Sequence, residues 1–172
     1  MGVSTRFIAR QLGGDSRRVI RAMPNTPMLL GEGMVALAAG EHATPGDMET
    51  ARSFFHAAAT VIDVSEEKLD AVTAVSGSGP AYFFYLAEQM IRAAVDLGLS
   101  PAEAHLLVTR TATGAARMLA ESGDAADVLR RKVTSPGGTT NAAITHLDAS
   151  QWPQATVDAI KAAARRSKEL SL

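Results

Sequence analysis

The sequence of 172 residues contains no cysteine, and this absence excludes several kinds of chemistry at once. Without thiols there can be no disulfide bond, no zinc–thiolate site and no cysteine nucleophile. The histidines are few and scattered, at His42, His56, His105 and His146. A metal centre or a serine hydrolase needs such residues grouped with suitable partners, so we predict neither.

An excess of charge of one sign and a long apolar run are also missing. Lys and Arg number 17 and Asp and Glu number 18, so no basic surplus indicates nucleic-acid binding. The most apolar run, residues 81–87, stops at Glu88 and is too short to span a bilayer. The start of the chain is too polar for a signal peptide. We therefore predict a packed cytoplasmic protein with neither nucleic acid nor membrane as a partner.

The part of the chain up to Ser65 predicts a small amount of sheet. Short strands are expected at residues 18–23, 34–40 and 60–64, and helices at residues 5–12 and 45–59, the second with Thr44 as its N-cap. The stretch "MPNTP" is expected to be a rigid loop without regular structure, because it contains two prolines. Three short strands make a poor sheet alone, so this part resembles the end of a larger sheet.

The part after Ser65 predicts helices almost throughout. They are expected at residues 66–75, 81–97, 101–121, 124–133, 140–146 and from about residue 153 onward. Ser100 and Glu103 predict a capping box at the start of one of them. The helix at 81–97 is apolar around most of its circumference. Burial between subunits is one explanation, and a central position in a monomeric bundle is the alternative.

Two glycine-containing stretches resemble functional motifs, but the neighbouring sequence does not support either function. "GEGMVA", residues 31–36, has the spacing of a dinucleotide-binding fingerprint. That fingerprint needs a strand before it and a helix after it, whereas here a strand is expected to follow, so we predict a turn. "SGSGP", residues 76–80, lacks the first glycine of a nucleophile elbow. We predict a joint between two helices there, where backbone can approach a ligand or another chain closely.

The stretch "TSPGGTTN", residues 134–141, is the strongest local signal. Pro136 fixes one dihedral angle, Gly137 and Gly138 allow positive φ, and Thr139 or Thr140 can cap the following helix. Successive N–H donors at the positive end of a helix would make a site for a carboxylate or a phosphate. A capped helix start without any ligand is the other explanation, and the residues alone leave both open.

Three motifs, in this order, resemble the pyrroline-5-carboxylate reductase family. They are "VIRAMPNTP" (residues 19–27), "DAVTAVSGSGPAYFF" (residues 70–84) and "RRKVTSPGGTTNAAI" (residues 130–144), and the similarity extends over essentially the whole chain. The resemblance implies a Rossmann domain that binds NADPH or NADH, followed by a helical domain that interlocks with its partner's to form a homodimer or a larger oligomer. It also implies the reduction of 1-pyrroline-5-carboxylate to L-proline, the last step of proline synthesis.

The resemblance also assigns roles to individual residues, none of them a metal ligand. The substrate carboxylate is expected at the backbone N–H groups around Ser135, Gly137, Gly138, Thr139 and Thr140. Thr73 is the catalytic candidate, because it matches the threonine whose hydroxyl hydrogen-bonds the ring nitrogen of the substrate. The residues expected near the nicotinamide end of the cofactor are Met23, Pro24 and Asn25.

One departure from the family limits these expectations. The family's glycine-rich cofactor loop and the first strands of its sheet have no counterpart here, so the chain resembles a C-terminal portion of the enzyme. The expected fold class is mainly α. We predict that residues 1–65 are the C-terminal remnant of a Rossmann-like domain, and that residues 66–172 form a helical dimerisation and substrate-binding domain. We expect no proline formation by this chain alone.

Two other functions remain open at this stage. One is a non-catalytic helical dimerisation module, which a clean dimer without ligand binding would support. The other is a stand-alone carboxylate-binding protein that uses the glycine-rich loop. Titration with proline would separate them, because the second requires binding that Thr73→Val and Gly138→Val both weaken.

Overall fold

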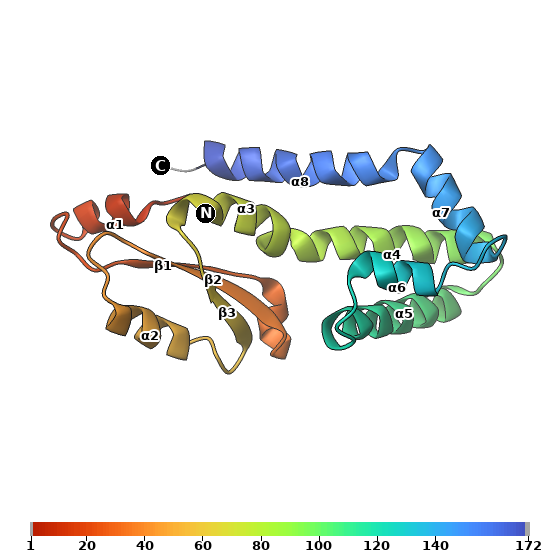
Figure 1. Cartoon of the computed structure of the whole chain (residues 1–172), viewed down its shortest axis with the longest axis horizontal. Coiled ribbons are helices and arrows are strands. Elements are labelled where there is room, and N and C mark those ends of the chain that lie inside the picture. The colour runs from red at the N-terminus through yellow and green to blue at the C-terminus, as the bar shows by residue number, and fades with distance from the viewer. Residues whose placement is uncertain (1, 171–172) are drawn as a thin grey trace. The chain divides into compact units, whose positions relative to one another are not determined.

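The computed structural model describes residues 2–170 (Figure 1). These residues form two compact units, which are described separately. The first contains residues 2–81 together with residues 157–170, and the second contains residues 82–156. Of the described residues, no helix is both long enough and apolar enough to cross a membrane.

The first unit is built on a mixed sheet of three strands in the order β1-β2-β3. The strands are β1 (Ile20–Pro24), β2 (Gly33–Ala39) and β3 (Ala59–Asp63). β1 pairs antiparallel with β2, whereas β2 and β3 run parallel. A parallel pair requires a crossover connection, and helix α2 (Pro45–Ser53) supplies it. All three predicted strands are therefore confirmed, with small shifts at their ends.

The core of the first unit is centred on β2. Val35, Ala36, Leu37 and Ala38 are all fully buried, as expected for a central strand covered on both faces. Ala36 and Ala38 pack against Leu69, which is fully buried as well. Figure 1 shows α2 on one face of the sheet and helix α3 (Leu69–Val72) on the other.

The N-cap predicted at Thr44 is confirmed at the start of α2. Thr44 accepts a hydrogen bond from Asp47 N, and the Asp47 carboxylate accepts one from Thr44 N, which completes a capping box at α2. Ser4 caps helix α1 (Thr5–Gln11) in a similar way. The predicted end of α2 at residue 59 is wrong, however. Residue Ala59 instead begins β3, opposite Gly33, because strand pairing outweighs the helix propensity of alanine.

The segment after Ser65 is more irregular than the single helix predicted at residues 66–75. It consists of a 3₁₀ turn, η2 (Glu66–Lys68), then α3, then a π-helical turn, η3 (Thr73–Gly77). In this turn Ser78 N donates to Thr73 O at 2.8 Å. Helix α4 (Gly79–Asp96) follows directly, so the predicted joint between two helices is a π turn.

The expectation that "MPNTP" has no regular structure is also wrong. Pro24 is the last residue of β1, and a 3₁₀ helix, η1 (Thr26–Leu30), begins two residues later. Both prolines occupy positions that need no N–H donor. Pro24 ends a strand that lies at the edge of the sheet, and Pro27 lies in the first turn of η1.

The helices that follow are α5 (Pro101–Glu121), α6 (Ala126–Lys132), α7 (Thr139–Ala149) and α8 (Trp152–Glu169). The capping box of Ser100 and Glu103 is confirmed at α5. The predicted start of α6 at Asp124 is wrong, because Ala125 is its N-cap and the Asp124 carboxylate pairs with Lys132. The fold class is nonetheless the predicted one: mainly helical, with a short α/β portion at the front.

Candidate functional site

The glycine-rich loop between α6 and α7 forms a tight turn. Gly138 N donates to Ser135 O at 3.0 Å, and Gly137 has φ of +70°, a conformation that favours glycine. A Cβ at position 138 would lie 2.5 Å from Ser135 Oγ and 3.1 Å from Ser135 O, so Ser135 would have to shift to admit one. The turn therefore favours glycine at both positions.

The start of α7 differs in detail from the prediction. Thr139 and Thr140 were expected to cap the helix, but Gly138 is the N-cap and no side chain caps it. The first helical hydrogen bond runs from Ala142 N to Gly138 O at 3.1 Å. The N–H groups of Thr139, Thr140 and Asn141 precede this bond and have no partner within the helix. They lie at the positive end of a helix of 11 residues and can hold a small anion.

Thr73 is the first residue of the π turn and is almost completely buried, with 4% of its surface exposed. Its Oγ1 donates to Leu69 O at 2.8 Å. The hydroxyl hydrogen is thus used within the helix, while the oxygen retains the capacity to accept. On the same stretch of chain, Asp70 Oδ1 accepts from Ser167 Oγ of α8 at 2.7 Å.

The predicted cofactor residues lie against the π turn. Asn25 Nδ2 donates to both Ser76 O and Ser76 Oγ at 3.3 Å, and Asn25 Oδ1 accepts from Met34 N at 2.9 Å. The side-chain methyl of Met23 lies directly against Gly77, so a larger residue at position 77 would have to displace it. The first unit therefore brings Met23 and Asn25 together with the turn that begins at Thr73. Pro24, between them, is exposed at the end of β1.

Sequence reasoning missed Ser76 as part of this cluster. A signal for it was present, because the residue four positions later is Pro80, which has no N–H to offer the Ser76 carbonyl. The other candidates, from Ser135 to Thr140, belong to the second unit, whereas Thr73 and residues 23–25 belong to the first.

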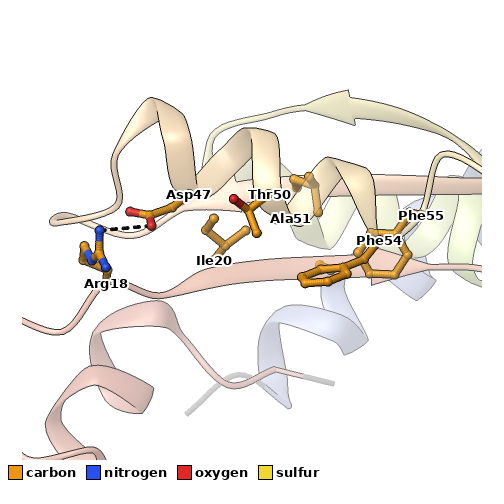
Figure 2. A pocket seen from close by; sticks show the side chains of 9 residues that line it. Arg18, Ile20, Asp47, Thr50, Ala51, Phe54 and Phe55 are labelled. Carbon is orange, nitrogen blue, oxygen red and sulfur yellow. Dashed lines mark ion pairs between the residues drawn. The ribbon is translucent and has the colours of Figure 1, made fainter.

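Two further features of the first unit do not add to the site. In "GEGMVA", Gly31 ends η1 with φ of +78° and Gly33 begins β2, so the predicted turn is confirmed and no helix follows the motif. A cavity of about 410 Å³ lies between α2 and the sheet (Figure 2). Its lining is largely apolar, with an ion pair of Arg18 and Asp47 at 3.2 Å, and it contains none of the predicted site residues.

Large apolar side chains are exposed along the helices of the second unit. They include Phe83, Phe84, Tyr85 and Leu86 of α4, and Leu106, Leu107, Met118 and Leu119 of α5. The circumference of α4 that was predicted to be buried is thus largely uncovered in the single chain. Many exposed apolar side chains on neighbouring positions of a helix often indicate an interaction site.

Comparison with known proteins assigns the chain to a family. Residues 66–170 match the family model described as pyrroline-5-carboxylate reductase dimerisation. The chain belongs to the pyrroline-5-carboxylate reductase family. Its relatives include the pyrroline-5-carboxylate reductases of Synechocystis, 41% identical over 98% of this chain, and of Mycobacterium tuberculosis, 44% identical over 90% of it. The chain spans 62% and 58% of the length of these two reductases.

Solved structures of reductases agree with this assignment. The pyrroline-5-carboxylate reductase of Coxiella burnetii superposes with a TM-score of 0.93 at 42% identity, over 100% of this chain and 64% of that one. A Plasmodium falciparum pyrroline carboxylate reductase with NADP bound superposes with a TM-score of 0.91 at 28% identity. That match covers 99% of this chain and 68% of the other.

Proposed function

We propose that this chain supplies the substrate-binding and dimer-forming part of a pyrroline-5-carboxylate reductase. The proposed reaction transfers a hydride from NADPH or NADH to the imine carbon of 1-pyrroline-5-carboxylate and gives L-proline. Family membership supports the reaction class. The observation that carries the proposal for this chain is the row of N–H donors, without any side-chain cap, at the start of α7.

In this proposal the substrate carboxylate accepts hydrogen bonds from the N–H groups of Thr139 and Thr140, with the Ser135 hydroxyl beside them. Three properties of the loop support it. Ser135 and Thr139 are exposed, Gly137 and Gly138 leave the backbone bare, and the helix dipole favours a negative charge. Hydrogen bonds to a charged acceptor are stronger than neutral ones, so the carboxylate fixes the position of the ring.

We further propose that Thr73 orients the ring nitrogen. Because its hydroxyl donates to Leu69 O, the oxygen is suited to accept from the N–H of a protonated imine or of proline. If the imine binds already protonated, no strong general base is needed, and the protein contributes mainly through positioning.

A nicotinamide cofactor would supply the hydride. The residues proposed to lie near its nicotinamide are Met23 and Pro24, at the end of β1. Asn25 is the third residue proposed there. Both ends of its amide are also bonded within the protein, to Ser76 and to Met34 N.

The homodimer is likewise a proposal for this chain. The exposed apolar side chains of α4 and α5 would be buried against a second copy, and the family model that matches residues 66–170 is named for dimerisation. We propose a domain boundary near Ser65, as the sequence suggests, since the family match begins at the next residue.

The carboxylate site is tested by titrating the chain with L-proline and following the binding by calorimetry. Position 139 allows a sharp comparison, because proline is tolerated at the first residue of a helix and Gly138 before it is extended. Thr139→Ala removes only the hydroxyl, whereas Thr139→Pro also removes the N–H donor. We expect Thr139→Pro to bind L-proline roughly tenfold more weakly than Thr139→Ala, as for one hydrogen bond to a charged group.

The same titration includes Thr73→Val and Gly138→Val, which we expect to weaken binding, and the exposed Thr145→Val on α7 as a control that does not. Amide chemical shifts of residues 139–149 verify that α7 persists in each variant. Equal affinities for Thr139→Pro and Thr139→Ala would show that the N–H row does not hold the carboxylate.

A further inference from the structure

We infer that Asn25 sets the position of Thr73 by supplying the hydrogen-bond donor that the π turn lacks. The inference rests on the proposed function only in giving Thr73 a substrate to orient. Asn25 is accordingly a positioning residue with respect to Thr73, because its effect on Thr73 passes through the turn.

The two ends of the Asn25 side chain bond in opposite directions. Oδ1 accepts from Met34 N at 2.9 Å, which anchors the amide to the first residues of β2. Nδ2 donates to Ser76 O and Ser76 Oγ, both at 3.3 Å. Asn25 and Ser76 are 51 positions apart in sequence, so the amide joins the sheet to the π turn.

The Ser76 carbonyl needs this donor because the chain cannot provide one in the usual way. In an α-helix, the partner of Ser76 O would be the N–H of Pro80, which does not exist. The next residue, Ala81, donates to Ser78 O instead, at 3.0 Å. A partly buried carbonyl that accepts no hydrogen bond destabilises the conformation in which it occurs. The Asn25 amide supplies the missing hydrogen bond to Ser76 O.

The Asn25 hydrogen bond influences Thr73 because the two ends of the π turn are hydrogen-bonded to each other. Ser78 N donates to Thr73 O at 2.8 Å, so the first residue of the turn is tied to the residue that follows its last one. Gly77, in between, lies against the Met23 side chain, and a Cβ there would lie 3.8 Å from Thr73 Cγ2. π-helical turns are rare and occur mostly as single-turn bulges within α-helices, frequently at functional sites. Loss of the Asn25 donor therefore allows the turn to relax and the Thr73 hydroxyl to shift.

The test separates the two ends of the amide. Asn25→Asp keeps an oxygen for Met34 N but, when ionised, has no donor for Ser76 O. Thr5→Val is the matched control, because it removes another hydrogen bond of the first unit, from Thr5 Oγ1 to Glu66 at 2.7 Å, away from the turn. Amide chemical shifts and hydrogen exchange are recorded by NMR, and L-proline affinity by calorimetry.

For Asn25→Asp at neutral pH we expect shift changes centred on residues 73–79, amide exchange there at least roughly tenfold faster, and L-proline binding about tenfold weaker, as for one lost hydrogen bond. At acidic pH the protonated carboxyl can donate again, so both effects should diminish. Thr5→Val should lower overall stability without either local effect, and Asn25→Ala should show no recovery with acid.

Unchanged amides at residues 73–79 in Asn25→Asp would overturn the inference, and so would a relaxed turn that binds L-proline as tightly as before. A wild-type chain that binds no L-proline would contradict the proposed substrate site. In that case the NMR comparison still decides whether Asn25 holds the turn.

Discussion

The two compact units differ sharply in how much apolar surface they bury within the single chain. In the first, four consecutive residues of β2 and Leu69 are fully buried. In the second, of the described hydrophobic residues only Ala104 and Val108 are buried, while Leu106 is 61% exposed and Phe83 is 70% exposed. Helix α5 of the second unit begins with a complete capping box, yet few apolar residues of this unit are buried.

The comparison shows that local signals and burial are separate requirements. A capping box determines where α5 starts. Most of the stability of a helix in a protein, however, comes from packing its apolar face against other elements, and α5 has little such packing within the single chain. Complete burial of one large apolar side chain stabilises a fold by about 1.5–3 kcal/mol. The exposed apolar side chains of α4 and α5 would therefore contribute more stability if they were buried than Ala104 and Val108 contribute now. We infer that the second unit is completed by a second copy of the chain, as proposed above.

The largest expected effect comes from charging this surface. Leu106→Glu places a carboxylate on the exposed face of α5, and we expect the dimer dissociation constant to rise at least roughly a hundredfold, because the charge would have to be buried. Leu12→Glu is the matched control, since Leu12 is 58% exposed and lies in the first unit. It should leave association unchanged. Sedimentation velocity over a range of concentrations measures the dissociation constants of both variants. Equal dissociation constants would contradict the proposed difference between the two units.

A smaller effect is expected in the core of the first unit. Leu37→Ala removes a fully buried side chain, and we expect it to lower the free energy of unfolding by about 2–5 kcal/mol. Because this core is contained within one chain, the loss measured by denaturant unfolding of the first unit should not depend on protein concentration. A loss that grows with dilution would show that the first unit also depends on association.

Sequence reasoning succeeded where the controlling interactions are local. The N-cap at Thr44 and the capping box of Ser100 and Glu103 depend only on neighbouring residues, so they could be predicted from the sequence. It failed where distant residues contribute, as at the π turn, where the amide of Asn25 bonds to Ser76 from 51 positions away in the sequence. The start of α7 was missed because a glycine can serve as N-cap and leave the threonines inside the helix.

The candidate site shows the same division. The glycine-rich loop could be recognised from its residues alone, because proline and glycine have strong backbone preferences that do not depend on distant residues. The roles of Thr73 and Asn25 came only from the family resemblance, and the bonds of Asn25 to Ser76 and Met34 could not have been foreseen from it.

The smallest expected effect compares the two capping boxes. Hydrogen bonds from Thr44 lower the pKa of Asp47 below its ordinary value of 3.8, with Arg18 assisting, and those from Ser100 lower the pKa of Glu103 below 4.5. A carboxyl whose pKa is lowered by folding stabilises the fold above its ordinary pKa. That contribution is lost as the pH falls through the lowered value.

We therefore expect hydrogen exchange at the first turns of α2 and α5 to accelerate below about pH 4, in addition to the ordinary pH dependence of exchange. Thr44→Ala and Ser100→Ala should each destabilise the local helix start by about 1 kcal/mol at neutral pH and remove that acid sensitivity. Acid sensitivity that survives both substitutions would assign it to other groups.

The central claim, that a second copy completes the helical unit, is tested most directly by sedimentation equilibrium of the unmodified chain, combined with thermal unfolding over a hundredfold range of concentration. The account predicts a dimer whose unfolding midpoint rises with concentration, as mass action requires. A monomer that unfolds at the same temperature throughout that range, with α4 and α5 intact, would contradict it.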